Sequence, residues 1–274
     1  MSMDGKYSVL IPVYWKENPE FLKESLDSLI RQSLRPAEIV LVEDGPVGEE
    51  LHSVISDYKK NHRNLRHIQL QENQGLGKAL NEGLKYCSFD LVARMDSDDI
   101  SKPHRMQKQM EIFQKYPEVD VVSSWIDEFE DEPSLIKSIR KLPEYPFEIF
   151  SFAKRRCPIN HPAVMFRKDA VMLAGGYRHF RLFEDYYLWV RMLLNGSKFY
   201  NIQESLLWFR TSSDMYKRRG GLKHALNEVR FQNLLRKMHF ISLWQEISNI
   251  LIRFTARVIP NNFRKFVYEN YLRK

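Results

Sequence analysis

Apolar residues follow two different spacings in the first hundred residues. Short stretches in which most residues are apolar predict strands that are buried on both faces. Such stretches lie at residues 8–13, 38–45, 65–70 and 90–96. Between them, apolar residues recur every three or four positions and predict helices at residues 18–32, 51–58 and 76–86. The first helix begins with Asn18 as a predicted N-cap and Pro19 at the first helical position.

The order of these segments predicts an α/β fold. Strand and helix alternate with short connections, which favours a mostly parallel, Rossmann-like twisted sheet with helices on both faces. In open sheets of this kind, ligands bind beyond the carboxyl ends of the strands. Three of the four predicted strands end in acidic or amide residues, in the segments VEDGP, QENQG and RMDSDD. We therefore expect a polar and partly anionic binding edge.

The pattern changes after about residue 103. Periodicity there predicts a helix at 103–117, a long strand at 119–130, a short strand and a helix within 158–178, a helix at 183–196 and a strand from 205. We expect one domain over residues 1–212, composed of the halves 1–102 and 103–212. A C-terminal helical region is expected over residues 213–274.

The C-terminal region carries most of the positive charge. The chain has a net charge of +7, and residues 210–274 contain 14 Lys and Arg against 4 Asp and Glu. Residues 240–260 are apolar but interrupted by charged residues, whereas a bilayer span takes about 20 predominantly apolar residues. We predict a basic amphipathic helix that associates with an anionic membrane surface. The alternative is a helix packed on the protein's own core or on a second subunit.

An acidic cluster follows the strand at 90–96. Carboxylates this close repel one another and lose hydration when buried, so Asp96, Asp98 and Asp99 need a cation. Oxygen ligands alone suit Mg²⁺ or Mn²⁺. A calcium loop is disfavoured because Ile100 stands where a third oxygen ligand belongs, and a zinc site lacks nitrogen and sulfur ligands. On these residues alone, a solvated acidic turn remains the alternative.

Five segments, taken together, resemble family 2 glycosyltransferases. They are SVLIPVYWKEN, EIVLVEDGP, NQGLGKALNEG, RMDSDD and FEDYYLWVRML, in the order and spacing of that family. The resemblance covers residues 7 to about 212 and is nearest to bacterial enzymes that build exopolysaccharide, capsule or O-antigen repeat units. It implies a GT-A fold, a nucleotide-sugar donor and inversion at the anomeric carbon. It also implies that residues 1–102 bind the nucleotide and that 103–212 form the acceptor side.

The resemblance implies roles for residues at the matching positions. Contacts to the UDP-sugar are expected from Pro12, Val13, Tyr14, Glu17, Asp44, Gly75, Lys78, Arg94, Asp96 and Ser97. Asp98, together with Asp96, would hold the Mg²⁺ or Mn²⁺ that bridges the diphosphate. Residues expected to face the donor sugar or the acceptor are Asp99, Glu184, His161, Tyr186 and Arg210. A buried structural histidine is the alternative for His161.

The resemblance makes Asp185 the expected general base. On the residues alone, acids at the start of a helix are also favoured by the helix dipole. Inversion requires one displacement, in which the acceptor hydroxyl loses its proton as it attacks, and one carboxylate within hydrogen-bond reach suffices for this. The expected acceptor is a hydroxyl of an oligosaccharide, linked to a polyprenyl diphosphate.

Two other functions use the same features. A metal-dependent nucleotidyltransferase or phosphatase could use the same aspartates, but the segment PVYWKENPE is not the Gly-rich basic loop that a nucleotidyltransferase usually carries. A nucleic-acid-binding protein could use the basic region, but the stacking platform of RNA modules is missing, and we expect no nucleic acid. Two cysteines without metal or disulfide spacing, and an N-terminus without a signal-peptide pattern, favour the cytoplasm. We expect a peripheral enzyme at the inner face of the cell membrane.

Overall fold

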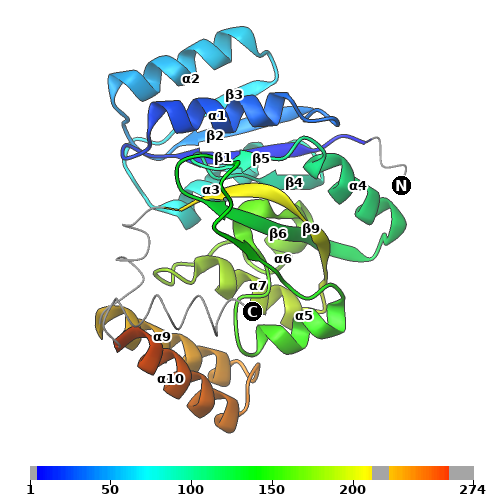
Figure 1. Ribbon diagram of the computed structural model, residues 1–274, viewed down its shortest axis with the longest axis vertical. Coiled ribbons are helices and arrows are strands. Elements are labelled where there is room, and N and C mark those ends of the chain that lie inside the picture. The colour runs from blue at the N-terminus through cyan, green and yellow to red at the C-terminus, as the bar shows by residue number, and fades with distance from the viewer. Residues whose placement is uncertain (1–4, 212–221, 259–274) are drawn as a thin grey trace.

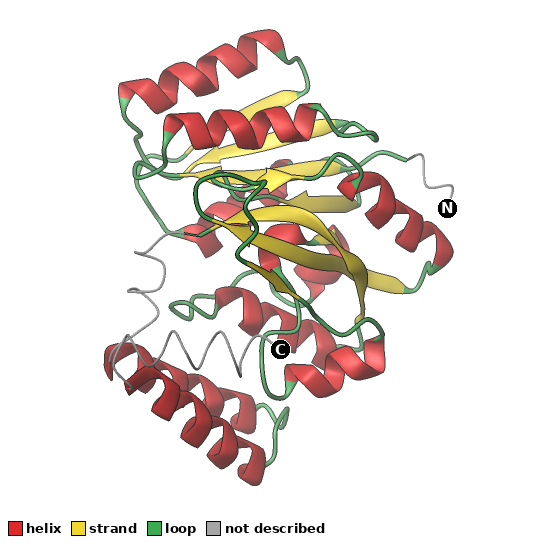
Figure 2. Cartoon of the chain, viewed as in Figure 1, coloured by secondary structure: helices red, strands yellow, loops and turns green. Residues whose placement is uncertain are grey.

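The sheet and its covering helices are seen in a computed structural model that describes residues 5–211 and 222–258 (Figures 1 and 2). Within these residues, nine strands form one sheet in the order β3-β2-β1-β4-β8-β6-β9-β5, with β7 paired to β6. The first four strands are β1 (Ser8–Val13), β2 (Glu38–Glu43), β3 (Leu65–Gln69) and β4 (Leu91–Arg94). They are parallel, as the alternating pattern predicts.

The helices of the first half begin and end close to their predicted positions. They are α1 (Pro19–Ile30), α2 (Glu49–Asn61) and α3 (Leu76–Tyr86). The side chain of Asn18 accepts a hydrogen bond from the backbone N–H of Glu20 at 2.8 Å, which confirms the predicted N-cap. Pro19 occupies the first helical position, where its missing N–H costs nothing.

The second half contains shorter and more varied elements. They are β5 (Ile100–Ser101), α4 (Arg105–Lys115), β6 (Val119–Phe129), β7 (Ser138–Arg140), α5 (Pro146–Ala153), the 3₁₀ turn η1 (His161–Ala163), β8 (Met165–Arg167), α6 (Lys168–Leu173), α7 (Glu184–Leu194) and β9 (Lys198–Arg210). β8 lies antiparallel between β4 and β6, so the sheet as a whole is mixed. The pattern analysis did not predict β5, β7 or α5.

Side chains alternate between the two faces of the sheet and form two hydrophobic clusters. Val9 and Ile11 of β1 join one cluster with the apolar residues of α1, α2 and α4. Leu10, between them, joins the other cluster with α3, α5, α6 and α7. Because both faces are buried, nearly every residue of the central strands is apolar, which explains the unbroken stretches in the sequence. Gly83 brings α3 close to the sheet, because a Cβ there would lie 2.3 Å from Leu10 Cδ1.

Two C-terminal helices, α9 (Leu222–Lys237) and α10 (Leu243–Val258), pack side by side at the end of the molecule far from α1 and α2 (Figure 1). α9 inserts Phe231 into the cluster that contains α7, where its ring stacks on Phe183 with centroids 4.6 Å apart. α9 therefore shares the core of the preceding domain. The predicted boundary between 212 and 213 lies outside the described residues.

α10 differs from an ordinary surface helix, because its polar side chains face the protein and its apolar side chains are exposed. Its buried and half-buried polar side chains face the protein, where Glu246 pairs with Arg236, Arg253 pairs with Glu228, and Asn249 donates to Gln232. Its exposed residues between 243 and 252 are all apolar except Ser248: Leu243, Trp244, Ile247, Leu251 and Ile252. In the described part of the chain, neither α10 nor any other helix has the length and apolar character needed to span a membrane.

Candidate active site

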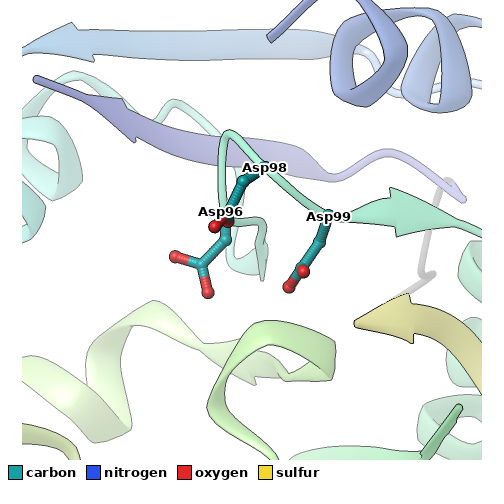
Figure 3. Close-up of side chains that lie close together, drawn as sticks. All are labelled: Asp96, Asp98 and Asp99. Carbon is teal, nitrogen blue, oxygen red and sulfur yellow. The ribbon is translucent and has the colours of Figure 1, made fainter. Parts of the chain in front are cut away.

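Three carboxylates converge in the turn between β4 and β5, at the carboxyl end of β4 (Figure 3). One oxygen from each of Asp96, Asp98 and Asp99 lies within 4.8 Å of the others. The turn brings them together because the chain bends sharply between the two strands instead of continuing the extended alternation of β4. The predicted acidic cluster is thus assembled at the ligand-binding edge of the sheet.

Two of these three carboxylates, Asp98 and Asp99, have no ion-pair partner among the described residues. Burial, followed by the neighbouring charges of Asp96 and Glu17, raises the pKa of Asp98 to about 7. Burial and the charge of Asp98 raise the pKa of Asp99 well above its ordinary value. The Oδ2 atom of Asp99 is buried and has no hydrogen-bond partner among the described residues. Clustered, underpaired oxygens of this kind fit a hard divalent cation.

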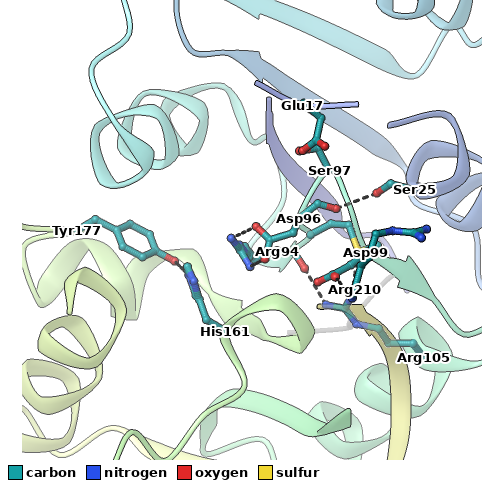
Figure 4. Close-up of polar contacts among 11 residues, drawn as sticks. Glu17, Ser25, Arg94, Asp96, Ser97, Asp99, Arg105, His161, Tyr177 and Arg210 are labelled. Atoms are coloured by element: carbon teal, nitrogen blue, oxygen red, sulfur yellow. Dashed lines mark hydrogen bonds and ion pairs between the residues drawn. The ribbon is translucent and has the colours of Figure 1, made fainter. Parts of the chain in front are cut away.

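A buried arginine holds Asp96. Arg94, the last residue of β4, contacts both carboxylate oxygens of Asp96 through two guanidinium nitrogens (Figure 4). Arg105 donates to the backbone oxygen of Arg94 at 2.7 Å, and Ser25 donates to the backbone oxygen of Asp96 at 2.8 Å. The turn is therefore fixed from α1 and α4 as well as from its own strand.

Arg210 holds the other side of the turn. Its backbone N–H donates to Asp99 Oδ1 at 2.8 Å, and its Nε donates to the backbone oxygen of Asp98 at 3.0 Å. The guanidinium also contacts Glu24 of α1 and lies 3.9 Å from the centroid of the Phe21 ring. Arg210 thus connects the end of β9 to the acidic turn, and its side chain is only 8% exposed.

The loop after β1 reaches the same turn. Glu17 accepts a hydrogen bond from the hydroxyl of Ser97, and burial raises the pKa of Glu17. Pro12 and Val13 are buried at the end of β1, and Tyr14 is half-buried just beyond it. The loop after β1 therefore contacts the acidic turn through Glu17.

The end of β2 is tied to the start of α3. The two carboxylate oxygens of Asp44 accept backbone N–H groups of Gln74 and Gly75 at 2.7 and 2.9 Å. Gly75 has a φ of +87°, which favours glycine at this entry to the helix. Lys78 is exposed in the first turn of α3. Asp44, Gly75 and Lys78 therefore form a group beside the β1 loop.

α7 presents two acids in its first turn. Burial, followed by the charge of Asp185, raises the pKa of Glu184. Cys157 Sγ lies 3.8 Å from Asp185 Oδ2. Tyr186, in contrast, is buried in the core, where its hydroxyl donates to the backbone oxygen of Ala153 at 2.5 Å and its ring packs on Phe231. The structure gives Tyr186 a packing role, with neither its ring nor its hydroxyl available to a sugar.

His161 is paired with a tyrosine that the sequence did not reveal. His161 Nε2 lies 2.9 Å from the hydroxyl of Tyr177, and both side chains are largely buried (Figure 4). Burial and the charge of Arg94 lower the pKa of His161 well below its ordinary value. Tyr177 lies beside the start of α7, because a Cβ added to Gly77 of α3 would lie 3.5 Å from Tyr177 Cβ and 3.6 Å from Glu184 Cγ.

Sequence reasoning missed four residues of this site: Ser25, Arg105, Cys157 and Tyr177. Ser25 and Arg105 lie on buried helix faces. A polar residue at a position that the helical period assigns to the core was the signal that could have revealed them. Tyr177 follows the Gly175-Gly176 pair, and that turn was the signal for a fixed backbone position. Cys157 had no local signal, because its contact with Asp185 depends on the tertiary fold.

Comparison with known proteins identifies related sequences and folds. Residues 8–172 match the family model "Glycosyl transferase family 2". The chain is 40% identical over 269 residues to the UDP-Gal:alpha-D-GlcNAc-diphosphoundecaprenol beta-1,3-galactosyltransferase of Escherichia coli, covering 98% of this chain and 97% of that one. It is 39% identical over 263 residues to the amylovoran biosynthesis glycosyltransferase AmsE of Erwinia amylovora, covering 96% and 98%. Among solved structures, S. aureus TarS 1–349 in complex with UDP-GlcNAc aligns with a TM-score of 0.65 at 18% identity, covering 97% of this chain and 74% of that one.

Proposed function

Because the chain belongs to glycosyltransferase family 2 and has the GT-A fold, we propose that it moves a sugar from UDP to a hydroxyl of a lipid-linked oligosaccharide, with inversion. The proposal rests mainly on the turn that gathers Asp96, Asp98 and Asp99, with Asp99 Oδ2 unpaired among the described residues, and α7 begins with a further pair of acids. The E. coli relative bears the name of an enzyme that uses UDP-Gal and a diphosphoundecaprenol acceptor. We infer the same classes of donor and acceptor here, in the synthesis of a bacterial surface polysaccharide.

Different strand ends would bind different parts of the donor. The β1 loop with Tyr14 and Glu17, and the end of β2 with Asp44, would hold the nucleoside. Asp98 and Asp96 would hold Mg²⁺ or Mn²⁺, which supplies positive charge to the departing diphosphate. Arg94 keeps the carboxylate of Asp96 in one orientation, because it contacts both of its oxygens.

Asp185 would act on the acceptor. The attacking hydroxyl loses its proton as its oxygen bonds to the anomeric carbon, while the bond from that carbon to the diphosphate oxygen breaks. A carboxylate at the start of α7 can take this proton, and the rigid packing of α7 against Phe231 keeps it in place. Glu184 would border the donor sugar beside it.

The test is a donor panel with the full chain. UDP-Gal, UDP-Glc, UDP-GlcNAc and UDP-GalNAc are each mixed with a GlcNAc-diphosphoryl lipid, and the release of UDP is measured with Mn²⁺ and with EDTA. We expect one donor to give UDP release that requires both acceptor and metal, and a product whose anomeric configuration is opposite to that of the donor. Release with none of the donors, or retained configuration by NMR, would contradict the proposal.

An enzyme with a lipid-linked acceptor acts at a membrane surface, and the exposed face of α10 fits that location. Trp244 is 80% exposed, and with Leu243, Ile247, Leu251 and Ile252 it forms an apolar surface. The helix cannot turn this surface inward, because its other face is held by the ion pair of Arg253 with Glu228 at 3.1 Å and by Asn249. A tryptophan among aliphatic residues is typical of helices that lie in the bilayer interface.

The charge beside α10 favours an anionic bilayer over a second protein copy. Lys154, Arg155 and Arg156 form the turn after α5, and α10 contacts it through Asn249 and Arg253, which donate to the backbone oxygens of Lys154 and Arg155. Residues 210–274, which include α10, contain 14 Lys and Arg against 4 Asp and Glu, and an excess of positive charge of this kind attracts anionic headgroups. We therefore assign this surface to the inner face of the cell membrane.

Vesicle flotation tests this surface. Trp244→Ser combined with Leu251→Ser should abolish binding to vesicles that contain phosphatidylglycerol, and the wild type should bind phosphatidylcholine vesicles weakly. Leu173→Ser is the matched control, because Leu173 of α6 is 79% exposed. If the double variant floats like the wild type, or if it changes a dimer to a monomer with no effect on flotation, the bilayer is not the partner.

A further inference from the structure

Tyr177 is held in a fixed position by α3. Its backbone N–H donates to Asn81 Oδ1 at 2.8 Å, and Asn81 Nδ2 donates to its backbone oxygen at 2.7 Å. Gly175 and Gly176 before it have φ angles of +82° and +61°, which permit the tight turn that leads into this clamp. The direction of the Tyr177 side chain is therefore set by the fold.

The Tyr177 hydroxyl and the His161 imidazole form a neutral hydrogen-bonding pair. Burial lowers the pKa of His161 and raises the pKa of Tyr177, so the ring stays uncharged and the hydroxyl keeps its proton at neutral pH. His161 also packs edge-on against Trp189 of α7, with ring centroids 5.9 Å apart. Both rings are thus restrained, and the pair offers hydrogen bonds without introducing a charge.

The position of the Tyr177–His161 pair relative to Asp96 and Asp185 indicates its role. Asp96 borders the proposed diphosphate position, and Asp185 is the proposed base. A Cβ added to Gly77 of α3 would lie 3.5 Å from Tyr177 Cβ and 3.6 Å from Glu184 Cγ, so Tyr177 lies beside the start of α7. In Figure 4, the Tyr177 hydroxyl is on the side of its ring that faces the Arg94–Asp96 contact. In a direct displacement, the sugar ring lies between the departing diphosphate and the attacking hydroxyl. The pair is therefore next to the space that the transferred sugar would occupy.

We propose that the Tyr177–His161 pair selects the donor sugar by hydrogen bonding to a hydroxyl of its ring. This inference rests on the proposed function and adds to it a determinant of sugar specificity. A donor epimer that carries this hydroxyl in the other configuration cannot form the hydrogen bond to the pair. Because the pair is largely buried, the missing bond costs energy and the epimer is disfavoured. Neither residue needs to take part in the bond-breaking step.

The test compares Tyr177→Phe with a matched control. Tyr7→Phe also removes a buried tyrosine hydroxyl, which donates to the backbone oxygen of Leu34 at 2.6 Å on the opposite face of the sheet. For Tyr177→Phe we expect the ratio of kcat/KM between the preferred donor and its epimer to fall about tenfold, with the affinity for UDP and Mn²⁺ unchanged. For Tyr7→Phe we expect a lower Tm and the wild-type ratio.

Two further results separate this inference from the proposed function. In ¹⁵N NMR of the wild type, UDP-sugar should shift the His161 ring resonances and UDP alone should not. If the wild type transfers sugar but Tyr177→Phe keeps its donor ratio, or slows all donors equally, the pair is structural and the inference fails. If the wild type transfers no sugar at all, the proposed function itself fails.

Discussion

Replacing Asp98 by asparagine should stabilise the metal-free protein at pH 8. Burial and the charges of Asp96 and Glu17 raise the pKa of Asp98 to about 7, from an ordinary value of 3.8. The folded protein therefore keeps a proton on Asp98 at pH values where the unfolded chain has released it. Since the fold binds more protons over that interval, the stability of the wild type decreases as pH rises from about 4 to 7. Asparagine has no charge to desolvate and avoids this loss.

The size of the effect follows from the same pKa values. At about 1.4 kcal/mol for each pH unit, the interval between the two pKa values lowers the free energy of unfolding by about 4 kcal/mol. The full loss applies at pH values above 7. The charge of Asp98 also raises the pKa of Asp99, so the two carboxyls titrate as a pair and the substitution removes only part of this energy. We therefore expect an increase of about 2 kcal/mol in the free energy of unfolding at pH 8.

Urea unfolding in EDTA at pH 4.5, 6, 7 and 8 measures this difference. Asp98→Asn should gain stability over the wild type with rising pH, whereas Asp131→Asn, which changes an exposed carboxylate, should show no such trend. Saturating Mn²⁺ should reverse the order, because only the wild type gains full binding energy from the ion. A variant less stable than the wild type at pH 8 in EDTA, or a difference independent of pH, would refute the reasoning.

Three other substitutions probe separate parts of the site and the fold. Asp185→Asn should lower kcat by about 10²- to 10⁴-fold while calorimetry shows unchanged UDP binding, and near-normal turnover would remove Asp185 from its role. Arg210→Lys keeps the charge but loses the Nε bond to Asp98, so the Mn²⁺ concentration for half-maximal activity should rise about tenfold; an unchanged metal dependence would contradict this. Gly83→Ala should lower the free energy of unfolding by about 1–3 kcal/mol in urea, because its Cβ would meet Leu10 and Val42, and a stability equal to wild type would show that the sheet yields there.

The first half of the fold was predictable because its strands are buried on both faces and its helices have long periodic apolar faces. The missed elements lack these signals. β5 has two residues and exists through its pairing with Leu207 and Trp208 of β9. α5 buries only Ile149 and Ala153, too few positions to establish a helical period. α9 lies within the C-terminal helical region that the sequence predicts, but its own bounds were not predicted, because polar residues such as Glu228 and Gln232 occupy its buried face.

The candidate site was predictable where its residues are neighbours in the chain. Asp96, Asp98 and Asp99 lie in one turn, so their proximity follows from the sequence. The bond between Tyr177 and His161 joins residues 16 positions apart through a helix and a strand, and no local pattern encodes it. For α10, the sequence shows that its two faces differ in polarity, but the inward direction of the polar face is set by Glu228 and Gln232 of α9.

The antiparallel direction of β8 has a consequence for how such enzymes can diversify. β8 runs antiparallel to its neighbour β4 and begins at the edge of the sheet where β4 ends. The segment that precedes β8, including Cys157 and His161, therefore lies at the binding edge. The segment that follows β8 begins at the opposite edge. Insertions before residue 164 would therefore remodel substrate recognition, whereas insertions just after residue 167 would enlarge a remote surface and leave specificity unchanged.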